Sequence, residues 1–220
     1  MRIGLFGGTF DPIHWGHLRS AEEVREALSL DRILFIPASR PPHKKGQHTT
    51  PAHHRLQMVR LAVKKNPRLR VSTVEIKRGG VSYSIDTLRY YARAVKGSNS
   101  YYFILGSDAF REIASWKNFR DIFPLCHFVV TSRPGSGNSN SLRQTPVAVQ
   151  KLFCYDLKRR IYRHRSGTDL YFVKLTDIAI SASGVRRRVQ EGKSIRYLVP
   201  LEVEAYIKKR GLYRQRQEER

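Results

Sequence analysis

Short apolar runs alternate with helical segments along the first 131 residues, and this alternation limits the possible folds more than any other feature of the sequence. The apolar runs lie at residues 2–7, 32–37, 70–76, 101–105 and 127–131. Strands that alternate with helices in this way form parallel sheets through right-handed crossovers. We therefore predict an α/β fold that is Rossmann-like and doubly wound. Its sheet is mostly parallel, helices cover both faces, and a helical segment follows at the C-terminus.

The helices between these strands are indicated by spacing and by capping residues. Residues 18–28 place apolar side chains on one helical face. A second helix begins at the pair Thr50 and Pro51 and ends near residue 65. A third begins at Ser84, which we expect to cap it, and ends near residue 95.

The last third of the chain is basic and less regular. Residues 143–165 carry seven lysines and arginines but one acid, Asp156. We expect a single domain over residues 1–220, in which residues 136–169 form a basic, insertion-like segment. The basic residues 143–165 should lie on a helix and loops beside the sheet edge, outside the active site. Residues 180–220 form the C-terminal part.

Two short patterns continue the fold beyond the basic segment. Residues 171–175 predict another strand. Pro200 begins an amphipathic helix that ends before Gly211. Together they predict that the chain returns to the sheet and then ends in helices.

The net charge of +23, from 41 Lys and Arg against 18 Asp and Glu, indicates which kinds of molecule the protein could bind. It suits a nucleic-acid-binding protein, and equally an enzyme whose substrates carry several phosphates. No apolar run reaches the roughly 20 residues that span a bilayer, and the first residues lack the longer apolar stretch and small-residue cleavage site that are typical of a secretory signal. The two cysteines, Cys126 and Cys154, lie far apart, which favours a reducing compartment. We therefore expect a cytoplasmic protein with no membrane partner and no metal site of its own.

The stretch GTFDPIHWGH, residues 8–17, carries the strongest chemical signal. Two glycines end the first strand, and His14 and His17 stand at the start of the first helix. Ligands of an open parallel sheet bind beyond the carboxyl ends of its strands. A helix N-terminus adds backbone N–H groups and a partial positive charge, and both histidines can donate hydrogen bonds. The stretch therefore predicts a site for a nucleotide phosphate.

The same residues resemble the T/HxGH signature of the nucleotidyltransferase superfamily, which transfers a nucleoside monophosphate from a triphosphate. ISASGVR, residues 180–186, is similar to the superfamily's second element, ISSTxIR. It departs from that pattern at Ala182, Ser183 and Gly184, although Ser183 keeps a hydroxyl and Arg186 keeps the guanidinium. The resemblance implies that residues 180–220 include the triphosphate-binding part of the site.

Six further stretches resemble bacterial nicotinate-nucleotide adenylyltransferases and cover nearly the whole chain outside residues 136–169. They are PPHK (41–44), SYSIDTL (82–88), LGSDAF (105–110), SWKNF (115–119), SRPG (132–135) and the C-terminal SIRYLVPLEVEAYIKKRGLY. The resemblance implies that nicotinate mononucleotide and ATP are joined to give nicotinate adenine dinucleotide and pyrophosphate, in NAD biosynthesis.

The resemblance also implies residue roles. His14, His17 and Arg186 would be catalytic. The ATP-binding residues would be Gly8, Thr9, Phe10, His14, His17, Lys44, Asp108, Ser181, Ser183 and Arg186. The nicotinate mononucleotide would contact Tyr83, Thr87, Trp116, Lys117 and Arg133, with the backbone of Thr87 and Lys117 near its carboxylate. Mg²⁺ would bind mainly through the ATP phosphates.

Two alternative functions stay open at this point. The same chemistry could use another acceptor, nicotinamide mononucleotide or phosphopantetheine. The chain could instead bind nucleic acid through the basic residues 143–165, which interleave with aromatic side chains. A weaker form of the second alternative is nonspecific attraction of nucleic acid to an enzyme.

Overall fold

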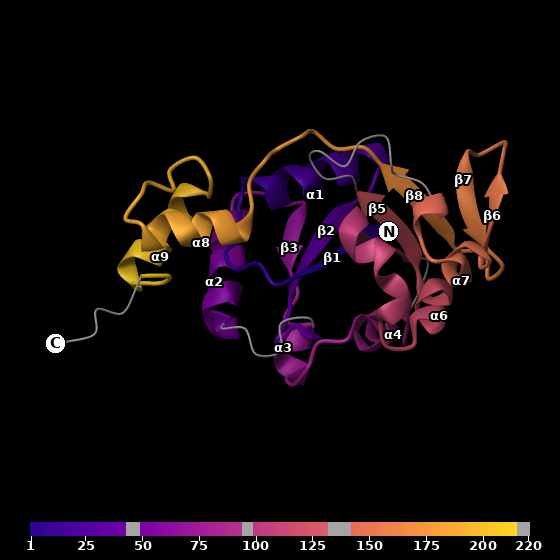
Figure 1. The fold of residues 1–220 in the computed structure, drawn as a ribbon, viewed down its shortest axis with the longest axis horizontal. Coiled ribbons are helices and arrows are strands. Elements are labelled where there is room, and N and C mark those ends of the chain that lie inside the picture. Colours follow the sequence, from indigo (N-terminus) through magenta and orange to yellow (C-terminus); the bar gives the residue numbers. More distant parts are fainter. Residues whose placement is uncertain (43–48, 94–98, 132–141, 215–220) are drawn as a thin grey trace.

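A single mixed sheet forms the centre of the computed structural model, which describes residues 1–42, 49–93, 99–131 and 142–214 (Figure 1). Within these residues the strand order is β3-β2-β1-β4-β5-β8-β7-β6. The strands are β1 (Arg2–Gly8), β2 (Arg32–Pro37), β3 (Leu69–Val71), β4 (Ser100–Gly106), β5 (His127–Thr131), β6 (Phe153–Asp156), β7 (Ile161–His164) and β8 (Asp169–Val173). All neighbours from β3 to β8 pair in parallel, and β7 and β6 pair antiparallel at one edge. The predicted doubly wound, mostly parallel sheet is confirmed.

Helices cover both faces of the sheet because successive strand residues point to opposite sides. On β4, Tyr102 and Ile104 pack into the core under α1 (Trp15–Ala27), α2 (Ala52–Val63), α8 (Ala182–Gln190) and α9 (Leu201–Lys209). The alternate residues Phe103 and Leu105 pack into a second core with α4 (Ser84–Arg93), α5 (Ser107–Arg111) and α6 (Phe119–Ile122). The remaining helices are α3 (Val74–Arg78) and α7 (Val147–Gln150), with 3-10 turns at Ile113–Ser115, Phe123–Leu125 and Leu142–Gln144.

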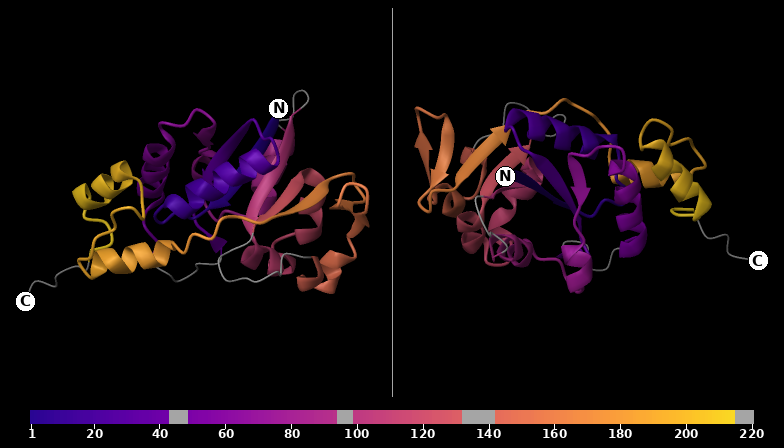
Figure 2. Two further views of the ribbon diagram at one scale, coloured as in Figure 1. Left: turned by 90° about the horizontal axis from the view of Figure 1, so that it is seen from above. Right: turned by 180° about the vertical axis from the view of Figure 1, so that it is seen from behind.

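The C-terminal helices α8 and α9 lie far from β8, the strand that precedes them in the chain, and close to the first half of the sheet. An extended connection leads from β8 across α1 to α8, and α9 lies beside α2 (Figures 1 and 2). The backbone N–H of Thr176 in this connection donates to Glu23 of α1 at 2.7 Å. The second sequence motif is thereby carried back to the first. No helix in the described ranges is long and apolar enough to span a membrane.

The predicted third strand, residues 70–76, is wrong over most of its length. Strand β3 ends at Val71, and residues from Val74 onward form helix α3. The β-branched side chains of this stretch are typical of a strand, but Glu75 is buried and accepts a hydrogen bond from the Thr87 hydroxyl at 2.6 Å. That tertiary contact favours the helix over the local preference. Ser84 also differs from the prediction, because it is the first residue of α4 rather than its cap.

The basic residues 143–165 were expected to lie on a helix and loops beside the sheet edge; their place at the edge is confirmed, but they include two strands rather than only a helix and loops. The two strands form the hairpin β6–β7, which extends the sheet at its edge, and α7 supplies one helical turn. The side chains of β6 are all exposed or half-buried, so this strand lacks the regular alternation of buried and exposed residues by which a strand is predicted from sequence. Asp169 is buried and accepts from Arg163 Nε at 3.0 Å and Arg159 Nη2 at 3.3 Å. These two arginines therefore neutralise an acid, whereas the neighbouring cations of the hairpin face solvent.

Candidate active site

The turn after β1 is fixed by packing as well as by hydrogen bonds. A Cβ on Gly8 would lie 2.8 Å from the Phe10 ring, so the close approach of that ring requires glycine. Phe10 has a φ of 49° and is almost fully buried. Its ring meets His17 edge-on, with centroids 5.1 Å apart. Phe10 was expected to offer its backbone to a nucleotide, and it also supports the ring of His17 from the core side.

His14 and His17 form a stacked pair at the start of α1. Their ring centroids are 3.7 Å apart and the planes differ by 27°. His14 is the N-cap residue and is buried, while His17 is half-buried. A Cβ on Gly16 would be 3.1 Å from the His14 ring, so glycine at this position makes room for the stack.

The hydrogen bond between the two histidines selects the tautomer of His17. The backbone N–H of His14 donates to His17 Nδ1 at 3.3 Å. A ring nitrogen that accepts a hydrogen bond carries no proton, so in the neutral ring the proton is on Nε2. His17 therefore presents an N–H donor on the side away from its own helix start. The first turn of α1 contains no acid that would cancel the positive end of the helix dipole.

The second motif lies directly beside this turn, although it is far away in the sequence. The Cβ position of Gly16 is 3.7 Å from the Ile180 carbonyl oxygen. Arg186 Nη1 donates to the Asp11 carbonyl oxygen at 2.7 Å. Ser181 caps α8 by accepting from the Gly184 N–H at 3.1 Å. The structure therefore joins two helix N-termini, the histidine pair and one guanidinium in a single cationic region.

The end of β4 supplies the acidic residue of the predicted site. β4 is the neighbour of β1, and the strand order changes direction between them, which is where doubly wound sheets bind ligands. Asp108 lies in the first turn of α5 and forms an ion pair with Arg111. Ser107, which the sequence reasoning missed, precedes it. Its Oγ is buried and has no hydrogen-bond partner among the described residues.

The predicted acceptor residues are brought together in part. Lys117 Nζ lies 4.6 Å from the centre of the Tyr83 ring, so these two side chains are in contact. Trp116 is half-buried, with its ring edge-on to Phe103 at 6.3 Å. The Thr87 hydroxyl donates to Glu75 and accepts from Arg78, and Thr87 is buried within α4, so its side chain is already engaged. Lys44 and Arg133 lie outside the described residues.

A buried arginine that the sequence reasoning missed holds the site together. Arg55 on α2 is 1% exposed and donates to three carbonyl oxygens, those of Thr50 at 2.8 Å, Thr9 at 2.9 Å and Ser39 at 2.8 Å. Burial lowers the pKa of Arg55, and the charge of Asp11 opposes that shift. A signal was present in the sequence, because helical spacing puts Arg55 on the same face as Val59 and Val63, where a charge needs partners.

Asp11 and Tyr213 complete this framework. Asp11 is 2% exposed, and its carboxylate accepts from Tyr213 Oη at 2.7 Å and from the Thr50 N–H at 3.1 Å. Burial raises the pKa of the Tyr213 hydroxyl, and the Asp11 charge raises it further. Tyr213 is therefore protonated, and donates, throughout the neutral pH range.

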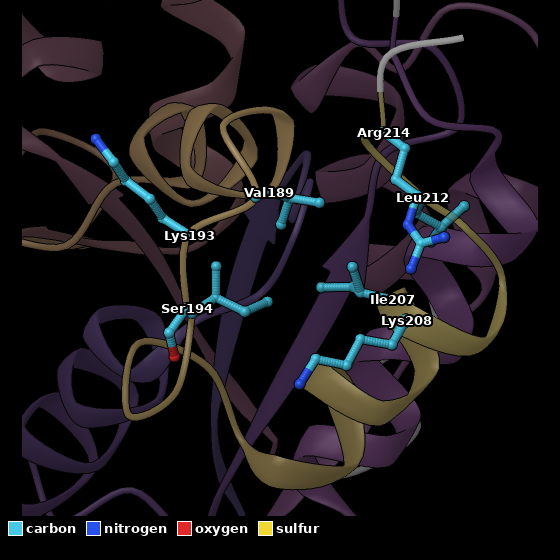
Figure 3. A pocket seen from close by; sticks show the side chains of 9 residues that line it. Val189, Lys193, Ser194, Ile207, Lys208, Leu212 and Arg214 are labelled. Atoms are coloured by element: carbon cyan, nitrogen blue, oxygen red, sulfur yellow. The ribbon is translucent and has the colours of Figure 1, made fainter. Parts of the chain in front are cut away.

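Neither a metal cluster nor the cavity of Figure 3 adds to this site. Over the described ranges, no group of three or more His, Cys, Asp or Glu could hold a metal ion. A cavity of about 330 Å³ lies at the other end of α8, between Val189, Ile207 and Leu212 (Figure 3). Two of its cations, Lys193 and Lys208, already pair with Glu191 and Glu204. The cavity is therefore separate from the cationic region at Ser181.

Comparisons with known proteins identify similar sequences and similar folds. The cytidylyltransferase-like family matches residues 5–188. Probable nicotinate-nucleotide adenylyltransferases of Geotalea daltonii and Syntrophotalea carbinolica are each 46% identical, over 97% of this chain and 98% of theirs. The solved Plasmodium falciparum nicotinic acid mononucleotide adenylyltransferase complexed with NaAD matches with a TM-score of 0.72 at 19% identity, over 96% of this chain and 97% of that one. A putative nicotinate-nucleotide adenylyltransferase of Vibrio parahaemolyticus gives a TM-score of 0.62 at 15% identity, over 97% and 96%. The two structures support the α/β fold.

Arg55→Met should destabilise the protein, because three carbonyl oxygens and the nearby Asp11 lose a cationic donor. At about 1 kcal/mol for each hydrogen bond lost, we expect the free energy of unfolding to fall by about 3 kcal/mol. Arg60→Met is the matched control, since Arg60 is exposed on the same helix and should change stability by about 0.5 kcal/mol or less. Urea midpoints measure both variants. Equal midpoints would contradict the role assigned to Arg55.

Proposed function

Because this chain belongs to the cytidylyltransferase-like family and, within it, to the nicotinate-nucleotide adenylyltransferases, we propose that it joins nicotinate mononucleotide and ATP. The products are nicotinate adenine dinucleotide and pyrophosphate, and the reaction serves NAD biosynthesis. The observation that carries this proposal is the meeting of His14, His17 and Arg186 at the carboxyl edge of the sheet. This arrangement supplies donors from several sides, as a triphosphate requires.

The reaction is a displacement at the α-phosphorus of ATP. A phosphate oxygen of the mononucleotide forms a new bond to that phosphorus, and the bond from phosphorus to the bridging oxygen of pyrophosphate breaks. The attacking phosphate is already ionised at neutral pH, so no general base is needed. Catalysis then consists of holding two anions in line and stabilising the charge that moves onto pyrophosphate.

Each of the predicted residues would contact the part of the substrate that lies nearest to it in the site. His17 would donate Nε2–H to the α-phosphate, and His14 and the backbone at Gly8, Thr9 and Phe10 would line the same side. Arg186, Ser181 and Ser183 would meet the β- and γ-phosphates, together with Lys44 from the PPHK stretch. Asp108 would contact the ribose. The support for these roles is the position of His17, Arg186 and Asp108 at the ends of adjacent strands and helices.

Mg²⁺ fits this site as a companion of ATP rather than as a protein-bound ion. Two acids of the proposed site are engaged, Asp11 with Tyr213 and Asp108 with Arg111. A hard cation would therefore keep phosphate oxygens and water as its ligands. When bound, it would neutralise part of the phosphate charge.

The acceptor would lie beyond β4 and α4. Trp116 offers a ring face to the pyridine, and the backbone of Lys117 and Thr87 could hold its carboxylate. Tyr83 and Arg133 would complete the pocket, with Arg133 at the mononucleotide phosphate. Cys126 and Cys154 are free thiols in the structure, and this fits a reducing compartment such as the cytoplasm.

Pyrophosphate release with ATP and each acceptor in turn tests the proposed function. We expect turnover with nicotinate mononucleotide that exceeds turnover with nicotinamide mononucleotide or phosphopantetheine. His17→Ala should lower this turnover by about 10²–10³, the usual effect of removing one oriented donor to a transition state. Salt-dependent retention of nucleic acid without turnover on any acceptor would contradict the proposal and favour the nucleic-acid alternative.

Trp116→Ala tests the acceptor side separately. If the indole stacks on the pyridine ring, the variant should raise the KM for nicotinate mononucleotide about tenfold, because stacking on a base is worth about 1–3 kcal/mol. The KM for ATP should stay within about twofold of its original value. Initial rates at varied concentrations of each substrate give both constants. Equal rises for both substrates would show that Trp116 acts through the core instead.

A further inference from the structure

The last described turn of the chain reaches the turn that bears the histidine pair. Tyr213 follows α9 and adopts a left-handed backbone conformation with a φ of 65°. Its hydroxyl donates to Asp11 Oδ1 at 2.7 Å, a contact between residues 202 positions apart. Asp11 lies between Phe10 and His14, inside the turn from β1 to α1. A side chain from the end of the protein therefore fixes a residue of the phosphate-binding turn.

Asp11 is held by three groups that lie outside its own turn. Its Oδ1 accepts from Tyr213, its Oδ2 accepts from the Thr50 N–H at 3.1 Å, and its carbonyl oxygen accepts from Arg186 Nη1 at 2.7 Å. Arg186 thus contacts the backbone of Asp11 while the carboxylate is satisfied by uncharged donors. This division matters because Arg186 is one of the groups proposed for the triphosphate.

We propose that Tyr213 is a positioning residue for adenylyl transfer: by satisfying the Asp11 carboxylate, it leaves the Arg186 guanidinium directed at the triphosphate. The inference rests on the proposed function and adds a residue that the sequence motifs do not contain. A buried carboxylate that loses a donor draws the nearest cation toward it, since an unsatisfied charge in a protein interior is costly. Arg55 also lies near the Asp11 charge, but three carbonyl oxygens hold its guanidinium, so Arg186, which already contacts the Asp11 backbone, is the cation that would move.

The test compares Tyr213→Phe with Tyr206→Phe. Both changes remove one hydroxyl from a half-buried tyrosine of the C-terminal segment, and Tyr206 bonds His54 Nδ1 at 2.8 Å, away from the site. We expect Tyr213→Phe to lower kcat/KM for ATP by about 10- to 100-fold, as small misplacements of catalytic groups do. The KM for the mononucleotide should stay within about twofold, and Tyr206→Phe should stay within about twofold in all constants, the ordinary spread of a peripheral change. Thermal unfolding should shift similarly in both variants.

A second substitution separates positioning from packing. Asp11→Asn in the Tyr213→Phe background removes the charge that would attract Arg186, so kcat/KM for ATP should rise by about threefold or more above that of Tyr213→Phe alone. Lost packing would not be repaired by this change. The inference is overturned if Tyr213→Phe matches Tyr206→Phe in activity, or if the double variant is no better than Tyr213→Phe. Absence of pyrophosphate release by the unmodified protein would instead overturn the proposed function.

Discussion

The fork of donors on one buried guanidinium sets the geometry on which the site depends. Arg55 binds the carbonyl oxygens of Thr9, Ser39 and Thr50, which belong to the turn after β1 and to the stretches on either side of the PPHK residues. A lysine could not reach all three, because its ammonium is a point charge rather than a planar fork. The nearby Asp11 carboxylate offsets the burial of the cation. Loops that are ordinarily the softest part of a fold are thereby tied to the core of α2.

Local arrangement, and not the net charge of +23, makes this site suited to phosphate. Asp108 pairs with Arg111, and Arg186 contacts the Asp11 backbone rather than its carboxylate, so among the described residues neither acid forms an ion pair with Arg186. The basic hairpin β6–β7 lies at the opposite end of the molecule from α9 (Figure 1). Exposed charges are screened beyond about 8–10 Å at physiological salt, so the hairpin can steer anions but cannot stabilise a transition state.

The sequence predicted those parts of the fold that depend on local pattern. Strands β2 and β5 have the expected bounds, and the glycines and histidines of residues 8–17 form the expected turn. Helix α3 was mistaken for a strand because the burial of Glu75 against Thr87 comes from a distant element. The hairpin was missed because its two strands, FCYD and IYRH, are only four residues long and show no regular alternation of polar and apolar side chains. Tyr213 and Asp11 were missed since no local pattern reports a contact 202 residues apart.

Histidine-ring ¹H–¹⁵N correlation spectra, assigned with His14 and His17 variants, test the central claim most directly. The claim is that the His14 backbone N–H occupies His17 Nδ1 and so presents Nε2–H to the α-phosphate. At a pH where the ring is neutral, we expect an unprotonated Nδ1 and a protonated Nε2, and ATP should shift the Nε2 signal most. A protonated Nδ1, or a His17 signal that ATP leaves unchanged, would contradict it.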